Sequence, residues 1–482
     1  MLIAFSVLCA ILGFVFLDVH RDEAMIGEHA YWFSKTFSVK STLARGLNQE
    51  WEQHLWHYHK LLVYSGAIVT SVFGFHLHAL RLVPLVFYLA FAFFFIRYLM
   101  WKYTVQTKWI VSALVLLFFN FQFYTSGLVY RPEILITLFG FLSFLQLEKF
   151  RKDKSSITLG LASMFVALAA LSHLNGLAFG VAGLVYVLSV SNWRKGVQFT
   201  LVAILFFIPY FWDLWSIENL QAWMHTIAED PNLAHQNNIL LQLVTRIAEE
   251  HMRWFRNPQM AWFFLAFFLS IIASGKAFWK KNSALVGYTF TLLIMVAILS
   301  YSKSTKYTIV YYPYMVLLII AAAKNELSKD KRRKIRKLYL SVYLAINIGY
   351  AYFSFSRSSF DVLEQNKQIE ALVKRENAQL ILADESFIFS SIGKYKLHMP
   401  YVYSLLYDKL EKDNELNSFL NFAAINHDDL VLIDKHRTGK NFYKKLHLEE
   451  LKPLQTIGEY QWLGVQNDVH VFKHISQEAN ER

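Results

Sequence analysis

The stretch ALRLVPLVFYLAFAFFFIRYL, residues 79–99, decides the fold class of this chain. Arg81 and Arg97 are its only charged residues, and the remainder is almost entirely apolar. A helix rises about 1.5 Å per residue, so a run of this length crosses a hydrocarbon layer of about 30 Å. The stretch therefore predicts a membrane-spanning helix.

The same pattern recurs along the first three quarters of the sequence. Of 482 residues, 55% are hydrophobic and only 17% are charged, a balance that excludes an ordinary soluble enzyme. Apolar runs bounded by charge predict about eleven spans. They lie at 1–17, 79–99, 109–125, 132–147, 156–172, 174–191, 197–215, 259–275, 283–300, 307–323 and 337–355. The fold class is thus predicted to be α-helical, polytopic and membrane-embedded.

Residues 1–17 are interpreted as a retained span. They lack the basic start of a signal peptide, and no small-residue cleavage site precedes Asp18. The single cysteine, Cys9, lies inside this run. No disulfide can form within the chain, and no cysteine-based metal site is available.

Charge predicts the orientation of the spans. The net charge is +12, and the excess lysine and arginine lie in short linkers, which indicates membrane orientation and not nucleic-acid binding. The basic linkers 102–108, 149–154, 194–195, 276–281 and 324–337 are predicted to be cytoplasmic, as is the N-terminus. The outer segments are then 18–78, 126–131, 172–173, 216–258, 301–306 and the region after 356.

The apolar run 61–75 could be a further membrane span or a surface helix. As a span, it would move every later loop to the opposite side of the membrane. The cluster 324–337 would then lie outside, against the charge bias. The run is also short for a crossing. We therefore predict an interfacial or re-entrant helix on the outer side.

The composition becomes that of a soluble domain near residue 357. Strand-like runs occur at 380–383, 430–433 and 469–472 between helical stretches, which predicts a small extracytoplasmic α/β domain. The predicted domains are thus 1–356, with 18–78 as a long outer loop, and 357–482. The sequence has no GxGxxG or P-loop motif, so nothing indicates a nucleotide site.

Carboxylates gather just after the first span. Asp22, Glu23 and Glu28 follow Asp18 on the predicted outer side. They are either solvated interface residues or include a general base, because partial burial raises a carboxylate's pKa and positions it on an acceptor hydroxyl.

Two short outer turns carry further charge. In Arg131-Pro132-Glu133, Pro132 suits a first helical turn, and Glu133 is either a helix-terminal charge or a site residue. Lys303 and Lys306, which precede Tyr307, lie on the predicted outer side, where the positive-inside rule disfavours lysine. They indicate an anionic partner, or lysines that reach lipid phosphates.

Histidines mark two more outer segments. His54, His57 and His59 lie close together, a pattern that is weak evidence for zinc. Contacts with an acceptor or with lipid headgroups, and interfacial packing, fit it better. His173 and Asn175 occupy a tight turn, where they line a cavity or Asn175 caps a helix.

The order of these pieces resembles a family. Asp22-Glu23 with Glu28, the long outer loop, the stretch ending 72–75 and the start of the span at 79–82 are similar to polyprenyl-phosphate-sugar-dependent glycosyltransferases of the GT-C fold. Within that fold, the bacterial protein-mannosyltransferase-like and aminoarabinose-transferase-like enzymes are most similar. Arg131-Pro132-Glu133 resembles their Arg-Pro-Asp turn, and Lys306-Tyr307 with Pro313 resembles their basic-Tyr…Pro segment.

The resemblance covers about residues 1–355 and has departures. The family often has paired prolines where this chain reads His57-Tyr58-His59-Lys60, and Asp where it has Glu133. These differences bear on acceptor and sugar specificity more than on the reaction class.

The resemblance implies a reaction and its residues. A sugar would pass, with inversion, from a polyprenyl-phosphate donor to an acceptor hydroxyl on the outer face of the cytoplasmic membrane. Asp22 would be the general base, with Glu23 and Glu133 beside it, and Arg131, Lys303, Lys306 and Tyr307 would bind the donor phosphate. Glu28, His57, His59, His173 and Asn175 would contact the acceptor or the sugar.

The motifs do not specify every property of the reaction. The sugar, the oligomeric state, a divalent metal and the nature of the acceptor, whether lipid, glycan or protein, are undecided. One alternative is a transporter or flippase of lipid-linked sugars, but such proteins often carry ionisable residues near mid-span, and this sequence shows none there. Another is an interaction protein that works through its C-terminal domain.

Overall fold

The structure is a computed structural model that describes residues 17–103, 107–228, 239–300, 303–325, 329–357, 362–407, 415–435 and 440–475. The predicted span 1–17 therefore lies outside the described residues, apart from Leu17. The chain divides into two compact units. The first comprises mainly residues 80–359 with the segment 59–65, and the second comprises 19–58, 66–79 and 360–482.

The first unit is helical. Its principal elements are α4 (Leu77–Lys102), α5 (Thr107–Phe118), α6 (Phe121–Leu128), α7 (Glu133–Asp153), α8 (Ser156–Ser172), α9 (Leu177–Val190), α10 (Trp193–Phe207), α11 (Ile217–Ala228), α12 (Ile239–Ala248), α13 (Glu250–Trp254), α14 (Pro258–Ile272), α15 (Lys276–Leu299), α16 (Tyr312–Asn325) and α17 (Lys329–Arg357), with the 3₁₀ turns η2 (Leu174–Gly176), η3 (Ile208–Phe211) and η4 (Thr305–Val310). Each predicted span from 79–99 onward falls on one of these helices or on a neighbouring pair.

Not all of these helices are long. Among the described residues, three helical segments are long and apolar enough to cross a membrane, namely Leu77–Lys102, Trp193–Phe211 and Lys276–Leu299. The predicted single span 109–125 is instead two helices, α5 and α6, which meet at an angle of 61° and would make a fourth crossing together. The Asn120 side chain accepts a hydrogen bond from the Phe123 N–H at 2.9 Å and so starts a new helix at the break.

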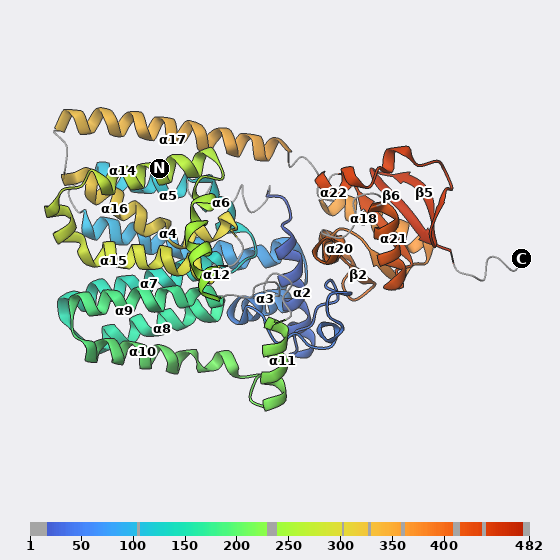
Figure 1. Ribbon diagram of the computed structural model, residues 1–482, viewed down its shortest axis with the longest axis horizontal. Coiled ribbons are helices and arrows are strands. Elements are labelled where there is room, and N and C mark those ends of the chain that lie inside the picture. The colour runs from blue at the N-terminus through green and yellow to red at the C-terminus, as the bar shows by residue number, and fades with distance from the viewer. Residues whose placement is uncertain are drawn as a thin grey trace, which may run out of the picture. The chain divides into compact units, whose positions relative to one another are not determined.

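Close helix packing depends on small residues. Helices α7, α8, α9 and α10 run side by side (Figure 1). A Cβ on Gly140 of α7 would lie 2.2 Å from the Phe179 ring of α9, so the ring occupies the space that the missing side chain leaves. Small residues at such contacts let helices approach closely in membranes. The interior of the bundle holds the buried rings of Phe144, Tyr288 and Tyr314.

The arginine at the start of the opening stretch is fully buried, and its charge is satisfied by backbone. Arg81 donates to the carbonyl oxygens of Leu17 at 2.8 Å and Asp18 at 2.9 Å. A buried guanidinium needs such partners. The beginning of α4 is thus fixed to the chain that follows the first predicted span.

Two of the basic linkers meet near the start of α8. Lys154 donates to the Val190 carbonyl at 2.6 Å, and Lys195 donates to the Ser156 hydroxyl at 2.8 Å. Helix α8 starts at Ser156 and ends at Ser172, next to His173. The predicted cytoplasmic linkers 149–154 and 194–195 therefore share one end of α8, and His173 lies at the other.

Residues 61–75 form the helix α3 (Lys60–Phe73), which stops at Gly74. Gly74 has φ +81°, in the left-handed region that favours glycine, and so ends the helix. The helix is 14 residues long, shorter than the roughly 20 residues of a typical crossing. Its helical nature agrees with the sequence, and its place at the membrane surface stays a prediction.

The described part of the second unit holds a six-stranded sheet in the order β2-β1-β3-β6-β5-β4. The strands are β1 (Leu380–Leu382), β2 (Lys396–His398), β3 (Leu430–Asp434), β4 (Thr456–Ile457), β5 (Tyr460–Gln466) and β6 (Val469–His474). Strand β1 pairs in parallel with β2 and β3, and the remaining pairs are antiparallel. The helices of this unit are α2 (Arg21–Thr36), α18 (Val362–Glu376), α19 (Ile388–Ser391), α20 (Pro400–Tyr407), α21 (Glu415–Ile425) and α22 (Lys440–Lys445), with the 3₁₀ turns η1 (Gln49–Glu52), η5 (Glu385–Phe387) and η6 (Leu448–Glu450).

The predicted strand-like runs are β1, β3 and β6, which lie next to one another in the sheet. Because their side chains are largely buried, their sequences are apolar and easily recognised. The C-terminal α/β domain is therefore confirmed. Strands β2, β4 and β5 escaped prediction, since they are short, mixed in polarity or near the sheet edge.

Residues 19–58 of the first predicted outer segment belong to this second unit. Arg21 donates to the Glu385 carboxylate at 3.1 Å, and the Met399 N–H donates to the Leu43 carbonyl at 3.3 Å. The Arg21 guanidinium also lies 3.5 Å from the Tyr401 ring centroid. Residues 19–58 thus fold with the C-terminal sheet, whereas the division into domains at residue 356 stays a prediction.

Candidate functional site

The Arg131-Pro132-Glu133 turn forms a buried ion pair at the start of α7. Pro132 is the N-cap and Glu133 the first helical residue, as the sequence predicts. Arg131 Nε lies 3.0 and 3.1 Å from the two Glu133 oxygens, and Nη2 lies 2.5 Å from Oε1. Glu133 is fully buried and Arg131 is 6% exposed. A pair buried this deeply needs both partners, because either charge alone would be costly.

Tyr307 of η4 joins this pair to the histidines. Its side chain interacts with Arg131, and its ring lies 5.8 Å from the His173 ring. The His173 ring in turn stacks on His59 at 4.6 Å. Turn η4 packs against α6 and α7, which brings residue 307 to residues more than 130 positions earlier. Five predicted site residues of the first unit therefore lie in one row, namely Glu133, Arg131, Tyr307, His173 and His59.

Lys306 precedes Tyr307 on the turn η4, and Lys303 lies just before the start of this turn. Lys306 lies close enough for its charge to act on Glu133. Lys303 lies 3.5 Å from the Glu250 carboxylate and donates to the Arg246 carbonyl at 2.5 Å. Lys306 thus adds positive charge beside Glu133, and Lys303 adds it beside Glu250.

Sequence reasoning missed two residues of this cluster, Glu250 and Arg253 of α13. Arg253 is fully buried, donates to Glu250 at 2.9 Å and to the Ser300 hydroxyl at 3.0 Å, and lies 5.9 Å from the Tyr307 ring centroid. Burial raises the pKa of the Glu250 carboxyl, opposed by Arg253 and Lys303. The available signal was the opposite charges at i and i+3 within the predicted outer segment 216–258.

A second missed pair holds the chain beside His59. Lys60 is 1% exposed and lies 2.6 and 2.5 Å from the two oxygens of Asp213. Burial lowers the pKa of Lys60 to about 8, although Asp213 opposes the shift. The pair fixes the start of α3 to the end of the α10–η3 segment. The sequence shows both residues at helix ends but not their contact.

The structure changes the predicted role of Asn175. The cap of η2 is His173, whose Nδ1 accepts the Asn175 N–H at 2.9 Å, and Asn175 itself is buried in the turn. The cap is thus made by the histidine and not by the asparagine. This bond also fixes the His173 ring that stacks on His59.

The acidic loop lies in the second unit at the start of α2. Glu23 and His20 make a capping box, in which the Glu23 carboxylate accepts the His20 N–H at 2.9 Å. The Asp22 side chain is 34% exposed, with one oxygen 3.8 Å from His20 Nδ1. Glu23 is fully buried. Of these two neighbours, Asp22 has the more accessible carboxylate, which suits it to contact an acceptor.

Glu28 organises the loop after α2. Its carboxylate accepts hydrogen bonds from Trp32 Nε1 at 3.2 Å, Ser41 Oγ at 2.9 Å, Thr42 N and Oγ1 at 2.6 and 2.5 Å, and the Leu43 N–H at 3.3 Å. Burial raises the pKa of this carboxyl, and these bonds oppose the shift. A carboxylate offers about four acceptor positions, so its capacity is filled. This bonding supports a structural role for Glu28 in place of a contact with sugar.

The histidines before α3 divide between two environments. His54 Nδ1 lies 2.8 Å from the Ser38 hydroxyl, and its ring contacts Trp56 at 3.6 Å. His57 is half-buried in the second unit, while His59 belongs to the first. Within the described residues, no group of three or more His, Cys, Asp or Glu side chains is arranged to hold a metal ion.

The site residues thus form two groups. One, in the first unit, joins Arg131, Glu133, His173, Tyr307 and Lys306 with His59, and it offers cations and polar rings to an anion. The other, in the second unit, presents Asp22 on a loop fixed by Glu23 and Glu28. The first group can stabilise negative charge that develops on a leaving phosphate. The second supplies a carboxylate that can accept a proton.

Together, the helical unit and the C-terminal sheet define a class, a polytopic α-helical membrane protein of the GT-C fold with a C-terminal α/β domain. No family model matches the sequence, and no curated protein matches it. Among solved structures, the crystal structure of ArnT from Cupriavidus metallidurans bound to undecaprenyl phosphate is similar, with a TM-score of 0.60. The alignment covers 99% of this chain and 98% of that chain at 10% identity, so the likeness is one of fold.

Proposed function

We propose that this protein is an integral-membrane glycosyltransferase that moves a sugar from a polyprenyl-phosphate donor to an acceptor hydroxyl. The observation that carries the proposal is the buried Arg131–Glu133 pair with the half-buried Tyr307 and Lys306 beside it, at one end of a GT-C helical bundle. The similar ArnT structure was solved with undecaprenyl phosphate, a lipid phosphate of the donor class.

The reaction is written as a single displacement. The acceptor oxygen forms a bond to the anomeric carbon while the bond from that carbon to the phosphate oxygen breaks, which inverts the anomeric centre. The acceptor proton passes to the Asp22 carboxylate, and the polyprenyl phosphate leaves with one more negative charge. Lys306, with Arg131 and Tyr307, stabilises that charge. Glu133 keeps the Arg131 guanidinium in place.

The charge distribution supports an orientation for the reaction. Basic residues Lys154 and Lys195 lie at the end of α8 opposite His173. Under the positive-inside rule the basic end is cytoplasmic, which supports an outward-facing cluster. The C-terminal domain stays extracytoplasmic as a prediction from the sequence. We therefore propose a multi-pass protein of the cytoplasmic membrane, with a cytoplasmic N-terminus, that modifies a cell-envelope lipid, glycan or protein.

The test uses membranes supplied with a panel of short-chain polyprenyl-phosphate sugars. We expect Asp22→Asn to lower transfer by about 10²- to 10⁴-fold, the usual contribution of a positioned base, without loss of membrane insertion. Lys306→Met should also lower transfer, because it removes charge at the leaving phosphate. Lys195→Met, at the opposite end of α8, is the matched control and should keep full activity.

Two results would contradict the proposal. Full transfer by Asp22→Asn would remove the assigned base. Movement of donor across the membrane without release of polyprenyl phosphate would indicate a transporter of lipid-linked sugars. Measuring both the free lipid phosphate and the glycosylated product separates these cases.

A further inference from the structure

The second unit contains a pocket that the proposed transfer reaction does not use. Its volume is about 510 Å³, within the usual range for small-molecule sites. One wall comes from α2 and the loop after it, and the other from the segment between β1 and β2. The lining residues are Trp32, Lys40, Thr42, Glu52, Gln379, Leu380, Ile388, Ile392, Gly393, Lys394, Tyr395, Lys396 and Leu397.

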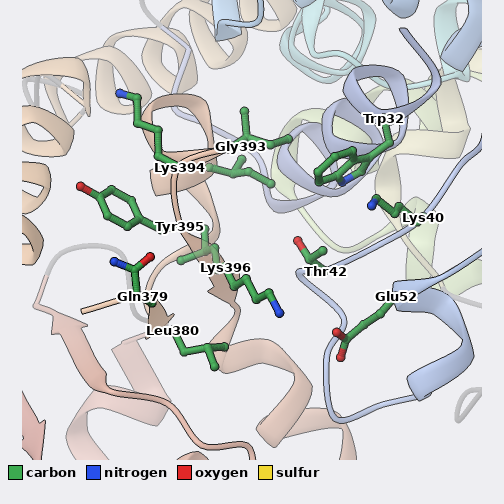
Figure 2. A pocket seen from close by; sticks show the side chains of 13 residues that line it. Trp32, Lys40, Thr42, Glu52, Gln379, Leu380, Gly393, Lys394, Tyr395 and Lys396 are labelled. Carbon is green, nitrogen blue, oxygen red and sulfur yellow. The ribbon is translucent and has the colours of Figure 1, made fainter. Parts of the chain in front are cut away.

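Two lysines face this pocket from opposite walls. Figure 2 shows the Lys40 and Lys396 ammonium groups extending toward the open space, whereas Lys394 extends away from it. Lys394 is held by Glu370 at 2.9 Å, and the acidic lining residue Glu52 pairs with Arg45 at 3.6 Å. Among the described residues, neither Lys40 nor Lys396 lies in an ion pair with a carboxylate. The pocket therefore carries positive charge that a ligand can neutralise.

The wall that carries Lys40 is fixed in advance. The Lys40 ammonium lies 3.8 Å from the Trp32 ring centroid, and the indole N–H donates to Glu28 at 3.2 Å. Thr42 is bound to the same carboxylate through its N–H and hydroxyl. Burial of Glu28 makes these bonds hard to exchange for water. Lys40 is thus presented by a rigid surface, which lowers the entropic cost of binding.

The two walls are also held together. Gly393 has φ +77°, and a Cβ at this position would lie 2.7 Å from the Tyr31 hydroxyl of α2. The turn before β2 therefore approaches α2 more closely than a residue with a side chain permits. This contact sets the separation between the wall of Lys40 and the wall of Lys396.

The cations of the lining suit a phosphate group. All cations among the described lining residues are lysines, and lysine is a common phosphate ligand in proteins. Lysine binds phosphate as a point charge from any direction. The apolar lining residues Leu380, Ile392 and Leu397 favour a ligand with an organic body beside its phosphate.

We propose that this pocket binds the phosphate group of a phosphate ester between Lys40 and Lys396. The ligand neutralises two cations on opposite walls and places its organic part against the apolar lining. The site is built from the second unit alone and does not involve Arg131 or Lys306. It is therefore independent of the proposed transfer reaction and can be tested separately.

The experiment measures ligand binding to the purified full-length protein in detergent by isothermal titration calorimetry at low salt. The probes are glucose 1-phosphate, inorganic phosphate and neutral glucose, with a separate arm of phosphatidylcholine vesicles that contain phosphatidic acid. We expect saturable binding of a phosphate-bearing probe and none of glucose. Preference for glucose 1-phosphate over inorganic phosphate assigns a soluble ester, and preference for the vesicles assigns a lipid headgroup. Equal binding of inorganic phosphate would contradict the contribution of the apolar lining and so overturn the assignment of an ester.

Variants connect the binding to the pocket. The double variant Lys40→Gln with Lys396→Gln should weaken binding by at least about 10-fold, because it removes two charge-assisted hydrogen bonds. Lys394→Gln is the matched control and should change binding less than about twofold, since its ammonium faces away. Lys306→Met should leave binding unchanged and thereby exclude the donor site. Thermal unfolding of each variant checks that it is folded.

The proposal is overturned if no phosphate-bearing probe binds saturably. It is equally overturned if the double variant binds as wild type does, or if Lys394→Gln loses as much affinity as the double variant. Failure of Asp22→Asn to reduce transfer would not affect this result, so the two proposals fail separately.

Discussion

Replacing Glu28 by glutamine tests whether this carboxylate holds the outer loop. In the native protein Oε1 accepts from Trp32 and from both donors of Thr42, and Oε2 accepts from Ser41 and Leu43. The amide of Glu28→Gln has one oxygen and one NH₂ group. We expect the oxygen to take the position with three donors, which turns the NH₂ group toward Ser41 and Leu43.

The cost follows from these two contacts. The Ser41 hydroxyl can rotate and accept from the new NH₂ group, but the Leu43 N–H cannot, and it is left facing a donor. An unsatisfied buried donor costs about 1–3 kcal/mol. The neutral amide avoids part of the burial cost that raises the pKa of Glu28, which reduces the penalty. A local destabilisation of about 2 kcal/mol is expected, and it corresponds to about 30-fold faster opening.

Hydrogen exchange measured by mass spectrometry is the appropriate assay, because it reports opening of a single segment. Peptides that cover residues 41–43 should exchange about 30-fold faster in Glu28→Gln. Glu50→Gln provides the control, since Glu50 is an exposed carboxylate in the same outer segment. Unchanged exchange at 41–43, or an equal change in the control, would refute the assigned role.

Two further predictions concern the helical bundle and the C-terminal domain. A Cβ on Gly176 would lie 2.3 Å from the Ala169 backbone, so Gly176→Ala should lower the melting temperature of the purified protein, whereas Gly160→Ala, with open space around it, should be neutral or stabilise by about 0.5–1 kcal/mol. Burial and the nearby Asp384 raise the pKa of Glu385 to about 7. The protonated Glu385 carboxyl therefore contributes its full stabilisation below pH 4.5, and this stabilisation is lost as the pH rises through 7. The shift in pKa corresponds to a loss of up to about 3 kcal/mol in the free energy of unfolding. Unfolding at pH 5 and pH 8 should show Glu385→Gln gaining on wild type with rising pH, and a constant difference would contradict the shift.

The helices and the central strands could be predicted from the sequence because each of these elements is recognisable from its own run of apolar residues. A helix in a bilayer must be apolar along its length, and buried strands such as β1 and β3 are apolar on both faces. The break at Asn120 was missed, because one asparagine within a run that is apolar on both sides does not by itself indicate that a helix ends. The short strand β2 was missed because its sequence, KLH, has no pattern long enough to recognise.

The candidate site was only partly predictable, for a physical reason. Helix-terminal features such as Pro132 and Glu133 are local and follow from neighbouring residues. The contacts of Lys60 with Asp213 join residues that are far apart in the chain, and no short-range pattern encodes them. Glu28 was expected to contact a ligand, since a carboxylate in an outer loop looks available until its distant donors are known.

The second unit is assembled from segments that are synthesised at widely separated times. The loop at 19–58 is synthesised almost at once, but its partners Glu385, Met399 and Tyr401 emerge only after all the helices of the first unit. At about 5–20 residues per second, the delay is on the order of tens of seconds. Strand β6, which lies between β3 and β5, arrives later still. Residues 19–58 must therefore remain unaggregated until these later partners have been synthesised.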